Sequence, residues 1–186
     1  MWHKEIILLI TATVFCTVAS AQKVAIKNNL LMDGMASPNL GIEFKTGNRN
    51  TLEIPASFNL WNFSDDRKFK HFAVQPEFRW WLCEPFTGHF WGIHAHYAFY
   101  NVGGIGPFSS IKNNRYEGWV AGAGLSYGYN WIISPRWSIE FSVGAGYAYF
   151  SYDKYPCGKC QPKSYHKNKH YFGPTKAALT LVYLIK

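Results

Sequence analysis

Residues 137–149 read WSIEFSVGAGYAY, and the alternation within this segment decides the fold. Every odd position carries an aromatic or aliphatic side chain, whereas the even positions carry Ser, Glu, Gly or Ala. Successive side chains of a β-strand point to opposite faces, so this period of two predicts a strand with one apolar face and one small, polar face. Residues 119–131 repeat the pattern, with Trp, Ala, Leu and Tyr opposing Val, Gly, Ser and Asn. The two segments therefore predict a sheet with two different faces.

The same alternation, followed outward in both directions, predicts eight strands. Their expected ranges are 23–31, 40–46, 51–60, 70–82, 88–100, 116–132, 137–152 and 171–186. Tight turns rich in turn-forming residues alternate with longer loops, at 32–39, 61–69, 101–115 and 153–170. An even strand number, with tight turns at one end and long loops at the other, is typical of outer-membrane barrels. We therefore predict an all-β fold, an eight-stranded antiparallel up-and-down β-barrel of outer-membrane type with its tight turns in the periplasm.

Composition and the N-terminal segment indicate the class and destination of the chain. Of its 186 residues 18% are aromatic and only 16% are charged, which excludes a disordered chain and suits a single domain. Lys4, an apolar stretch and the small-x-small tripeptide at 19–21 predict a cleaved signal peptide over 1–21, with an N-terminal membrane anchor as the alternative. Beyond that segment no apolar run reaches the ~18 residues of a spanning helix. We expect one barrel domain over 22–186 in the outer membrane of a Gram-negative bacterium.

Aromatic residues bracket two of the predicted strands. Trp119 and Trp131 lie near the ends of one, and Trp137 and Tyr147 bracket its neighbour. Ten to twelve residues at ~3.3 Å each, tilted by roughly 40°, separate such pairs by about 25–30 Å along a barrel axis. This spacing predicts two aromatic girdles at the two interfaces of a bilayer.

Two observations test this interpretation. A soluble, lipocalin-type periplasmic barrel would turn its apolar face inward around a lipid, but its outer face should then carry Lys, Glu and Thr rather than Gly, Ser and Ala. Pro55 and Pro76 fall inside predicted strands, where each removes a strand hydrogen bond. We expect bulges or displaced strand ends at both prolines.

The face opposite the apolar one collects the charged residues of the strands. An eight-stranded barrel is just wide enough for side chains to fill it, so these residues are expected to form an interior network of ion pairs and hydrogen bonds. The alternatives are a proton or ion path through Glu77, Arg79, His94 and His96, or an outer-membrane enzyme using the two histidines with Glu140. The predicted interior residues are Lys27, Glu43, Lys45, Glu53, Gln75, Glu77, Arg79, His94, His96, Glu140 and Lys176.

The longest predicted loop carries two cysteines. Cys157 and Cys160 are expected to form a small disulfide that stiffens this loop in an oxidising compartment. A zinc site with His166 and His170, or free thiols, are the alternatives, although the five residues between Cys160 and His166 are fewer than in zinc fingers. Cys83 has no evident partner within the chain.

Partners are expected through charge rather than through a cofactor. The mature chain keeps a net charge of +8, and the loop at 153–170 carries five lysines against one acid. This predicts an anionic partner such as lipopolysaccharide head groups or the acidic face of a surface protein. The alternative is that these lysines face solvent and bind no partner. No nucleic-acid surface and no cofactor motif is evident. The expected role is structural, in surface assembly or as an adhesion accessory.

Six short motifs carry a resemblance to a known family. They are 23–31 (KVAIKNNLL), 37–43 (SPNLGIE), 61–63 (WNF), 75–81 (QPEFRWW), 116–119 (YEGW) and 171–176 (YFGPTK). Together they resemble the uncharacterised Bacteroidetes proteins catalogued as a domain of unknown function (DUF number 3575), over essentially the whole mature chain. The resemblance implies a small outer-membrane barrel and, because some such proteins lie beside fimbria-type genes, an accessory role in surface assembly. It carries over no catalytic residues. The chain departs from common outer-membrane strands in ending Tyr183-Leu184-Ile185-Lys186 without a terminal aromatic.

Overall fold

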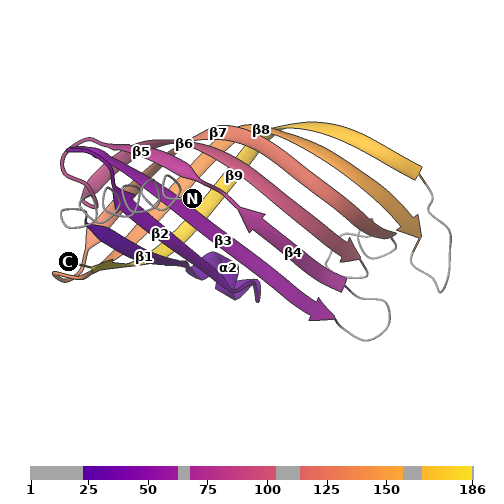
Figure 1. Ribbon diagram of the computed structural model, residues 1–186, viewed down its shortest axis with the longest axis horizontal. Helices are drawn as coiled ribbons and strands as arrows, with labels where there is room; N and C mark the ends of the chain where they lie inside the picture. Colours follow the sequence, from indigo (N-terminus) through magenta and orange to yellow (C-terminus); the bar gives the residue numbers. More distant parts are fainter. Residues whose placement is uncertain (1–22, 63–67, 104–113, 157–164, 186) are drawn as a thin grey trace, which may run out of the picture.

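The computed structural model describes residues 23–62, 68–103, 114–156 and 165–185. In these ranges the chain forms strands and one short helix, with the tight turns at one end (Figure 1). The elements are β1 (Val24–Asn29), α2 (Leu30–Gly34), β2 (Asn39–Lys45), β3 (Asn50–Asn62), β4 (Lys68–Val74), β5 (Glu77–Trp81), β6 (Gly88–Gly103), β7 (Asn114–Ile132), β8 (Trp137–Pro156) and β9 (Tyr165–Ile185). The predicted signal peptide lies outside the described residues.

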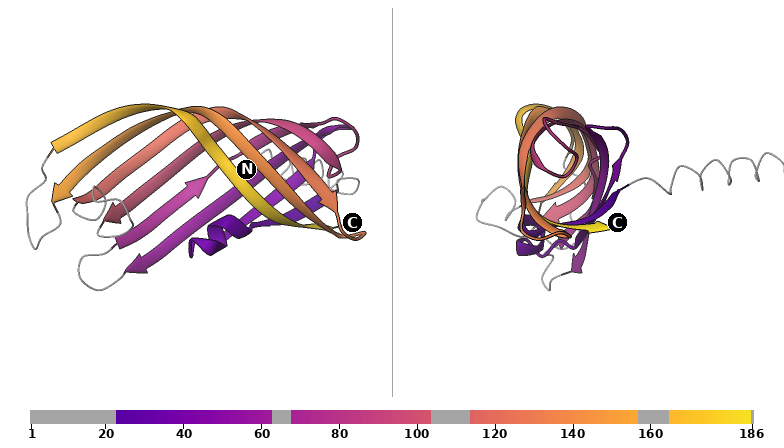
Figure 2. Two further views of the ribbon diagram at one scale, coloured as in Figure 1. Left: turned by 180° about the vertical axis from the view of Figure 1, so that it is seen from behind. Right: turned by 90° about the vertical axis from the view of Figure 1, so that its left-hand side faces the viewer.

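The strands close into a ring of antiparallel pairs. β1 pairs with β2 and β9, and neighbours along the chain pair from there around to β8. β4 and β5 share one position, because both pair with β3 on one side and with β6 on the other. The ring thus has eight positions, and the predicted eight-stranded antiparallel barrel is confirmed. Figure 2 shows it along its axis.

Of the bulges or displaced strand ends expected at the prolines, displaced ends are found at Pro76, where β4 ends at Val74 and β5 begins at Glu77, and neither proline produces a bulge. β4 and β5 keep the same pairing register on both sides of Pro76, so the strand is interrupted there without a shift. Pro55 lies opposite this interruption, and its carbonyl accepts the Gln75 N–H at 3.2 Å. Because a residue's N–H and C=O point to the same neighbouring strand, the donor that Pro55 lacks also falls at the break. The two prolines therefore share one defect in the ladder.

Among the described strands, the pairing register shifts between β8 and β9. Gly144 pairs with Lys176 but Ala145 pairs with Pro174, so Thr175 is the extra residue of a bulge. A one-residue insertion reverses which side chains face inward. Lys176 accordingly faces the interior, whereas the even-numbered Phe172 beyond the bulge is 84% exposed on the outside.

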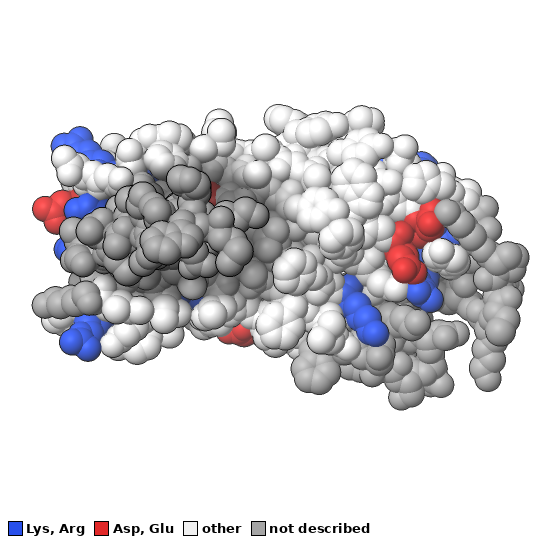
Figure 3. All heavy atoms as spheres, in the orientation of Figure 1, with Lys and Arg blue, Asp and Glu red and all other residues white. Residues whose placement is uncertain are grey.

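The two faces of the sheet divide by polarity as the alternation predicts. Large apolar side chains such as Trp91, Leu125, Trp131 and Phe141 are exposed on the outside, whereas charged side chains are buried within. In Figure 3 the charged atoms lie mostly toward the two ends of the molecule, with a mostly uncharged surface between them. A lipocalin-type barrel has the opposite arrangement, so the alternative of an apolar interior is wrong for this structure.

The walls of the barrel differ greatly in length. β1 and β2 have 6 and 7 residues, whereas β7, β8 and β9 have 19, 20 and 21. The ranges expected from the sequence underestimate this difference, because they extend the first strand to residue 31 and start the last at residue 171. Leu30 and Leu31 instead open helix α2, where the Asn29 side chain accepts the Leu31 N–H at 3.1 Å as an N-cap. No helix among the described residues is long and apolar enough to span a membrane.

Candidate functional site: a buried ion network and the cavity above it

Charged side chains from nearly the whole ring meet inside the barrel. We call the buried ion network the set contributed by β1, β2, β3, β5, β6, β8 and β9, with β7 supplying only small residues. Each strand places its member there because inward positions recur every second residue and the ring brings them to a common axis. The members are Lys27, Glu43, Glu53, Glu77, Arg79, His94, Glu140 and Lys176.

Arg79 is the centre of this network. Its Nε contacts Glu77 Oε1 at 2.6 Å, and its Nη1 contacts Glu43 Oε2 at 3.1 Å and Glu140 Oε2 at 3.0 Å. Its Nη2 donates to Glu53. The side chain is fully buried and its guanidinium lies 4.4 Å from the centre of the Phe90 ring. One planar, five-donor group thus binds four carboxylates, which a lysine could not do with the same geometry.

Two lysines, Lys27 on β1 and Lys176 on β9, complete the ion pairs. Lys27 Nζ lies 2.5 Å from Glu43 Oε2 and 2.7 Å from Glu140 Oε2. Lys176 Nζ lies 2.6 Å from Glu77 Oε2 and 3.5 Å from Glu53 Oε2. Glu43, Glu77 and Glu140 each contact two of the network's three cations, and Glu53 contacts all three. Removing one cation would therefore leave more than one buried carboxylate short of a partner.

Glycines of β7 and β8 make room for the histidines. A Cβ at Gly124 would lie 2.8 Å from His94 Nε2, one at Gly144 3.0 Å from His94 Cε1, and one at Gly122 2.5 Å from His96 Nε2. The glycine face read from the sequence is therefore the surface against which the imidazoles pack. His94 Nε2 reaches the Thr175 hydroxyl at 2.9 Å, which links the histidine to the bulge.

The network holds more permanent negative than positive charge. Four carboxylates face three cations, Lys27, Arg79 and Lys176. Several buried polar atoms of the described interior have no hydrogen-bond partner, namely His94 Nδ1, His96 Nδ1, Ser126 Oγ, Asn130 Oδ1, Glu140 Oε1 and Ser142 Oγ. Among the described residues no three His, Cys, Asp or Glu side chains are grouped so as to hold a metal ion. The arrangement fills the barrel with salt bridges.

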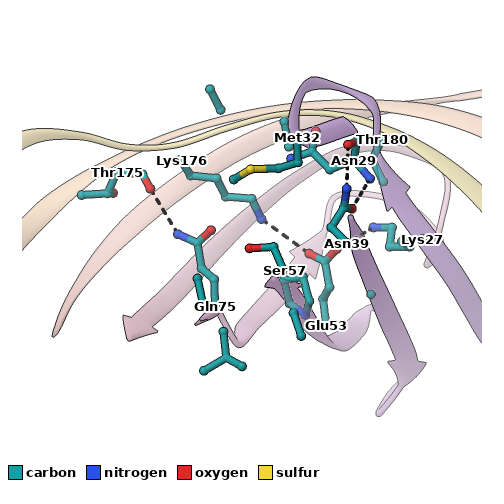
Figure 4. A pocket seen from close by; sticks show the side chains of 17 residues that line it. Lys27, Asn29, Met32, Asn39, Glu53, Ser57, Gln75, Thr175, Lys176 and Thr180 are labelled. Atoms are coloured by element: carbon teal, nitrogen blue, oxygen red, sulfur yellow. Dashed lines mark hydrogen bonds and ion pairs between the residues drawn. The ribbon is translucent and has the colours of Figure 1, made fainter. Parts of the chain in front are cut away.

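A cavity of about 120 Å³ lies above the network, on the side of the short strands. Figure 4 shows Lys176, Gln75, Ser57 and Glu53 around it, with Met32 of α2 at its margin. The Gln75 side chain donates to the Thr175 carbonyl at 3.2 Å. The wall of the cavity thus combines hydrogen-bond donors with the methyl groups of alanines from β3, β4 and β9.

The remaining predicted site residues are placed as follows. Lys45 lies at the tight-turn end of β2, partly exposed and outside the buried ion network. The His96 ring lies 5.9 Å from that of His94. Trp131, Trp137 and Tyr147 are 44–49% exposed, and Trp119 stacks on Tyr97 at 6.1 Å on the same outer face.

The predictions for the two loop cysteines concern residues that the structure does not describe. Cys157 and Cys160 lie outside the described residues, so neither their disulfide nor the zinc alternative is tested. His166 contacts Asp153 at 2.7 Å and His170 contacts the Tyr147 hydroxyl at 2.5 Å. Cys83 is exposed and free.

Sequence reasoning missed several residues that support the network. Thr51 is fully buried, donates to Glu43 and accepts the Trp81 indole N–H at 2.9 Å. Its position on the inward period of β3 was a usable signal. The roles of Phe90 beneath Arg79 and of Thr175 in the bulge were not visible, because both depend on pairing between distant strands.

The fold and this interior define a class: small closed β-barrels with a salt-bridged core and an apolar exterior. A family model matches residues 6–185, nearly the whole chain, and carries the description "Protein of unknown function (DUF3575)". The chain belongs to this family, as its motifs indicate. A comparison with curated proteins gives no match.

Proposed function

We propose that this protein is a small outer-membrane barrel with a structural role in surface assembly or adhesion. The observation that carries the proposal is the reversal of polarity between its faces, with side chains such as Leu125 and Trp91 more than half exposed and Arg79 and Glu77 wholly buried. Water would stabilise the opposite arrangement, whereas a lipid environment stabilises this one. A cleaved signal peptide would deliver the mature chain, which is expected to begin at Gln22.

The ion-paired interior favours a scaffold over a conduit. Arg79, Lys27 and the glutamates cross the lumen, so that the barrel wall is braced from within. At the far end, beyond the apolar surface, Lys167 and Lys169 are exposed on β9. These lysines suit contact with anionic groups, either lipopolysaccharide head groups or an acidic surface of a fimbrial or other surface protein.

Thiol labelling in intact cells tests the placement. One variant keeps Cys83 in the tight-turn end as its only mature thiol, with Cys157 and Cys160 replaced by Ser. The other also carries Cys83→Ser and has a new thiol at exposed Asn168 of β9. A membrane-impermeant maleimide is expected to label Asn168→Cys in intact cells, and Cys83 only after permeabilisation. Recovery of both variants in the soluble periplasmic extract, or the reverse labelling, would overturn the proposal.

The partner is tested separately. Lys167→Gln with Lys169→Gln is expected to weaken binding of the purified barrel to vesicles containing lipopolysaccharide, and added salt should weaken wild-type binding in the same direction. A Lys45→Gln variant at the opposite end is the matched control. Equal binding by all three proteins would mean that these lysines form a solvated face.

A further inference from the structure

The barrel wall is incomplete on one side. β9 pairs with β1 only from Ile185 to Thr180, and the described chain offers Tyr165–Leu179 no strand on that side. β3 pairs with β2 only as far as Ser57, and its continuation has β4 as its strand partner. On the other side the segment after α2 supplies single hydrogen bonds, from the Phe58 N–H to the Pro38 carbonyl at 3.0 Å and from the Asn59 side chain to the Ala36 carbonyl at 2.9 Å. At the long-strand end β9 and β3 therefore lie at opposite edges of a curved sheet, as Figures 1 and 2 both show.

The length of the short strands places this opening within a bilayer. At ~3.3 Å per residue and a tilt of about 40°, the 6 residues of β1 rise about 15 Å and the 7 of β2 about 18 Å. The apolar band of an outer-membrane barrel is about 25 Å tall. This inference rests on the membrane placement proposed above. On that placement β1 and β2 fall short of the height of the apolar band by roughly 7–10 Å.

Each element of the rim carries exposed apolar side chains. Phe172 on β9 is 84% exposed, Leu60 on β3 is 73% exposed, and Met35 just after α2 is 56% exposed. Phe58, Leu30 and Leu31 add 40–49% exposed side chains around them. Exposed apolar side chains of this kind are suited to contact with hydrocarbon.

A second strand is a poor occupant of this opening. Pro174 removes a backbone donor from the free edge of β9, and the bulge at Thr175 breaks its regular spacing. Farther along the edge stand Lys167 and Lys169. Prolines, bulges and lysines are the features by which edge strands resist the addition of another strand.

The cavity behind the rim favours an uncharged acceptor. It is lined by Ser57, Gln75 and Lys176 and has the room of about four water molecules at ~30 Å³ each. Lys176 is already paired with Glu77 and Glu53, and the network beneath carries more carboxylates than cations. A phosphate would add negative charge there, whereas the carbonyl oxygen of an ester would accept hydrogen bonds without doing so.

We propose that this opening is a lipid-binding site, in which one acyl chain of a membrane lipid lies on the apolar rim and its ester carbonyl enters the cavity to accept hydrogen bonds from Gln75 and Ser57. Helix α2 forms the floor of the opening and places Met32 at the margin of the cavity (Figure 4).

Fluorescence quenching by lipids with brominated acyl chains tests the opening. In a background without the native mature cysteines, a bimane probe is attached in turn to Ser57→Cys, Val120→Cys and Phe141→Cys. Ser57 and Val120 lie in one row of paired inward residues but three strands apart, whereas Phe141 faces outward. Since the bromines lie within the roughly 30 Å hydrocarbon core, the Ser57 probe is expected to be quenched at least about twofold more strongly than the Val120 probe.

The outcomes separate this inference from the membrane placement. Strong quenching at Phe141 with equal, weak quenching at Ser57 and Val120 would overturn the lipid site and leave the membrane barrel standing. Absence of quenching at Phe141 would overturn both. A probe at Gln75→Cys, which lines the same cavity, repeats the measurement if Ser57→Cys folds poorly.

Ether-linked lipids test the carbonyl. For this test the probe is attached at Ala73→Cys, which lines the same cavity and leaves Ser57 and Gln75 in place. Brominated diacyl lipid is expected to quench this probe more strongly than a dialkyl ether lipid with the same chains, and Gln75→Leu is expected to abolish that preference. Equal quenching by both lipids in the parent protein would refute the hydrogen-bonding part of the proposal. Arg115→Gln, on the exposed face of β7, is the control substitution.

Discussion

Replacing Arg79 with Met should be among the most destabilising single substitutions in the described chain. The change keeps much of the side-chain volume but removes the cation that contacts Glu43, Glu53, Glu77 and Glu140. Breaking a buried ion pair by removing one partner costs about 3–5 kcal/mol, because an uncompensated charge stays in a low-dielectric interior. With Lys27 and Lys176 still present, we expect a loss of about that size in the free energy of unfolding.

Urea titration of the barrel in detergent micelles or lipid vesicles measures this loss. The seven tryptophans of the mature chain report the transition by fluorescence, and the mobility difference between folded and heated samples on gels reports the folded fraction. Arg115→Gln is the matched control, because Arg115 pairs with Glu117 at 2.6 Å on the surface, with 31% of its side chain exposed. Exposed pairs contribute about 0–1 kcal/mol, so this control should unfold almost as the parent does.

A compensating substitution makes the reasoning refutable. If the cost arises from unpaired carboxylates, adding Glu140→Gln to Arg79→Met should recover about 1 kcal/mol or more, since Glu140 keeps only Lys27 as its cation. The same Glu140→Gln change in the parent should destabilise. A loss below about 1 kcal/mol for Arg79→Met, or a double variant less stable than Arg79→Met alone, would refute the electrostatic account.

Other measurements address packing, register and conduction. Gly124→Val should lower the free energy of unfolding by about 1–3 kcal/mol, because a Cβ there would lie 2.5 Å from a backbone oxygen of β8 and 2.8 Å from His94. Gly34→Ala in α2 is the control, since a Cβ there meets nothing within 4 Å, and it should change stability by less than about 1 kcal/mol. Chemical unfolding compares the two variants. Deleting Thr175, the extra residue of the bulge, should leave Lys176 facing inward and Phe172 facing outward, so the folded yield on gels should stay close to that of the parent. A large loss of folded yield would contradict the assignment of Thr175 as the extra residue. Planar-bilayer recordings of the parent should show no discrete conductance steps, because salt bridges cross the lumen, and regular steps would favour the ion-path alternative.

The sequence by itself determined the faces of this protein. Period-two alternation in residues 119–131 and 137–149 separates an apolar from a polar and glycine-rich side without any tertiary information. Residues such as Glu77, Arg79 and Glu140 could thus be assigned to the interior from their position in that alternation. The tight turns could also be located, because their residues favour turns locally.

Only the tertiary structure decided which of these residues meet. The contact of Arg79 with Glu140, 61 positions away, depends on the stagger of the whole ring, which no local pattern encodes. The same holds for the bulge at Thr175, which shows only against β8, and for the interruption at Pro76, which leaves the register unchanged. The opening between β3 and β9 arises because β1 and β2 end early, and strand length is fixed by the partners a strand finds rather than by its own alternation.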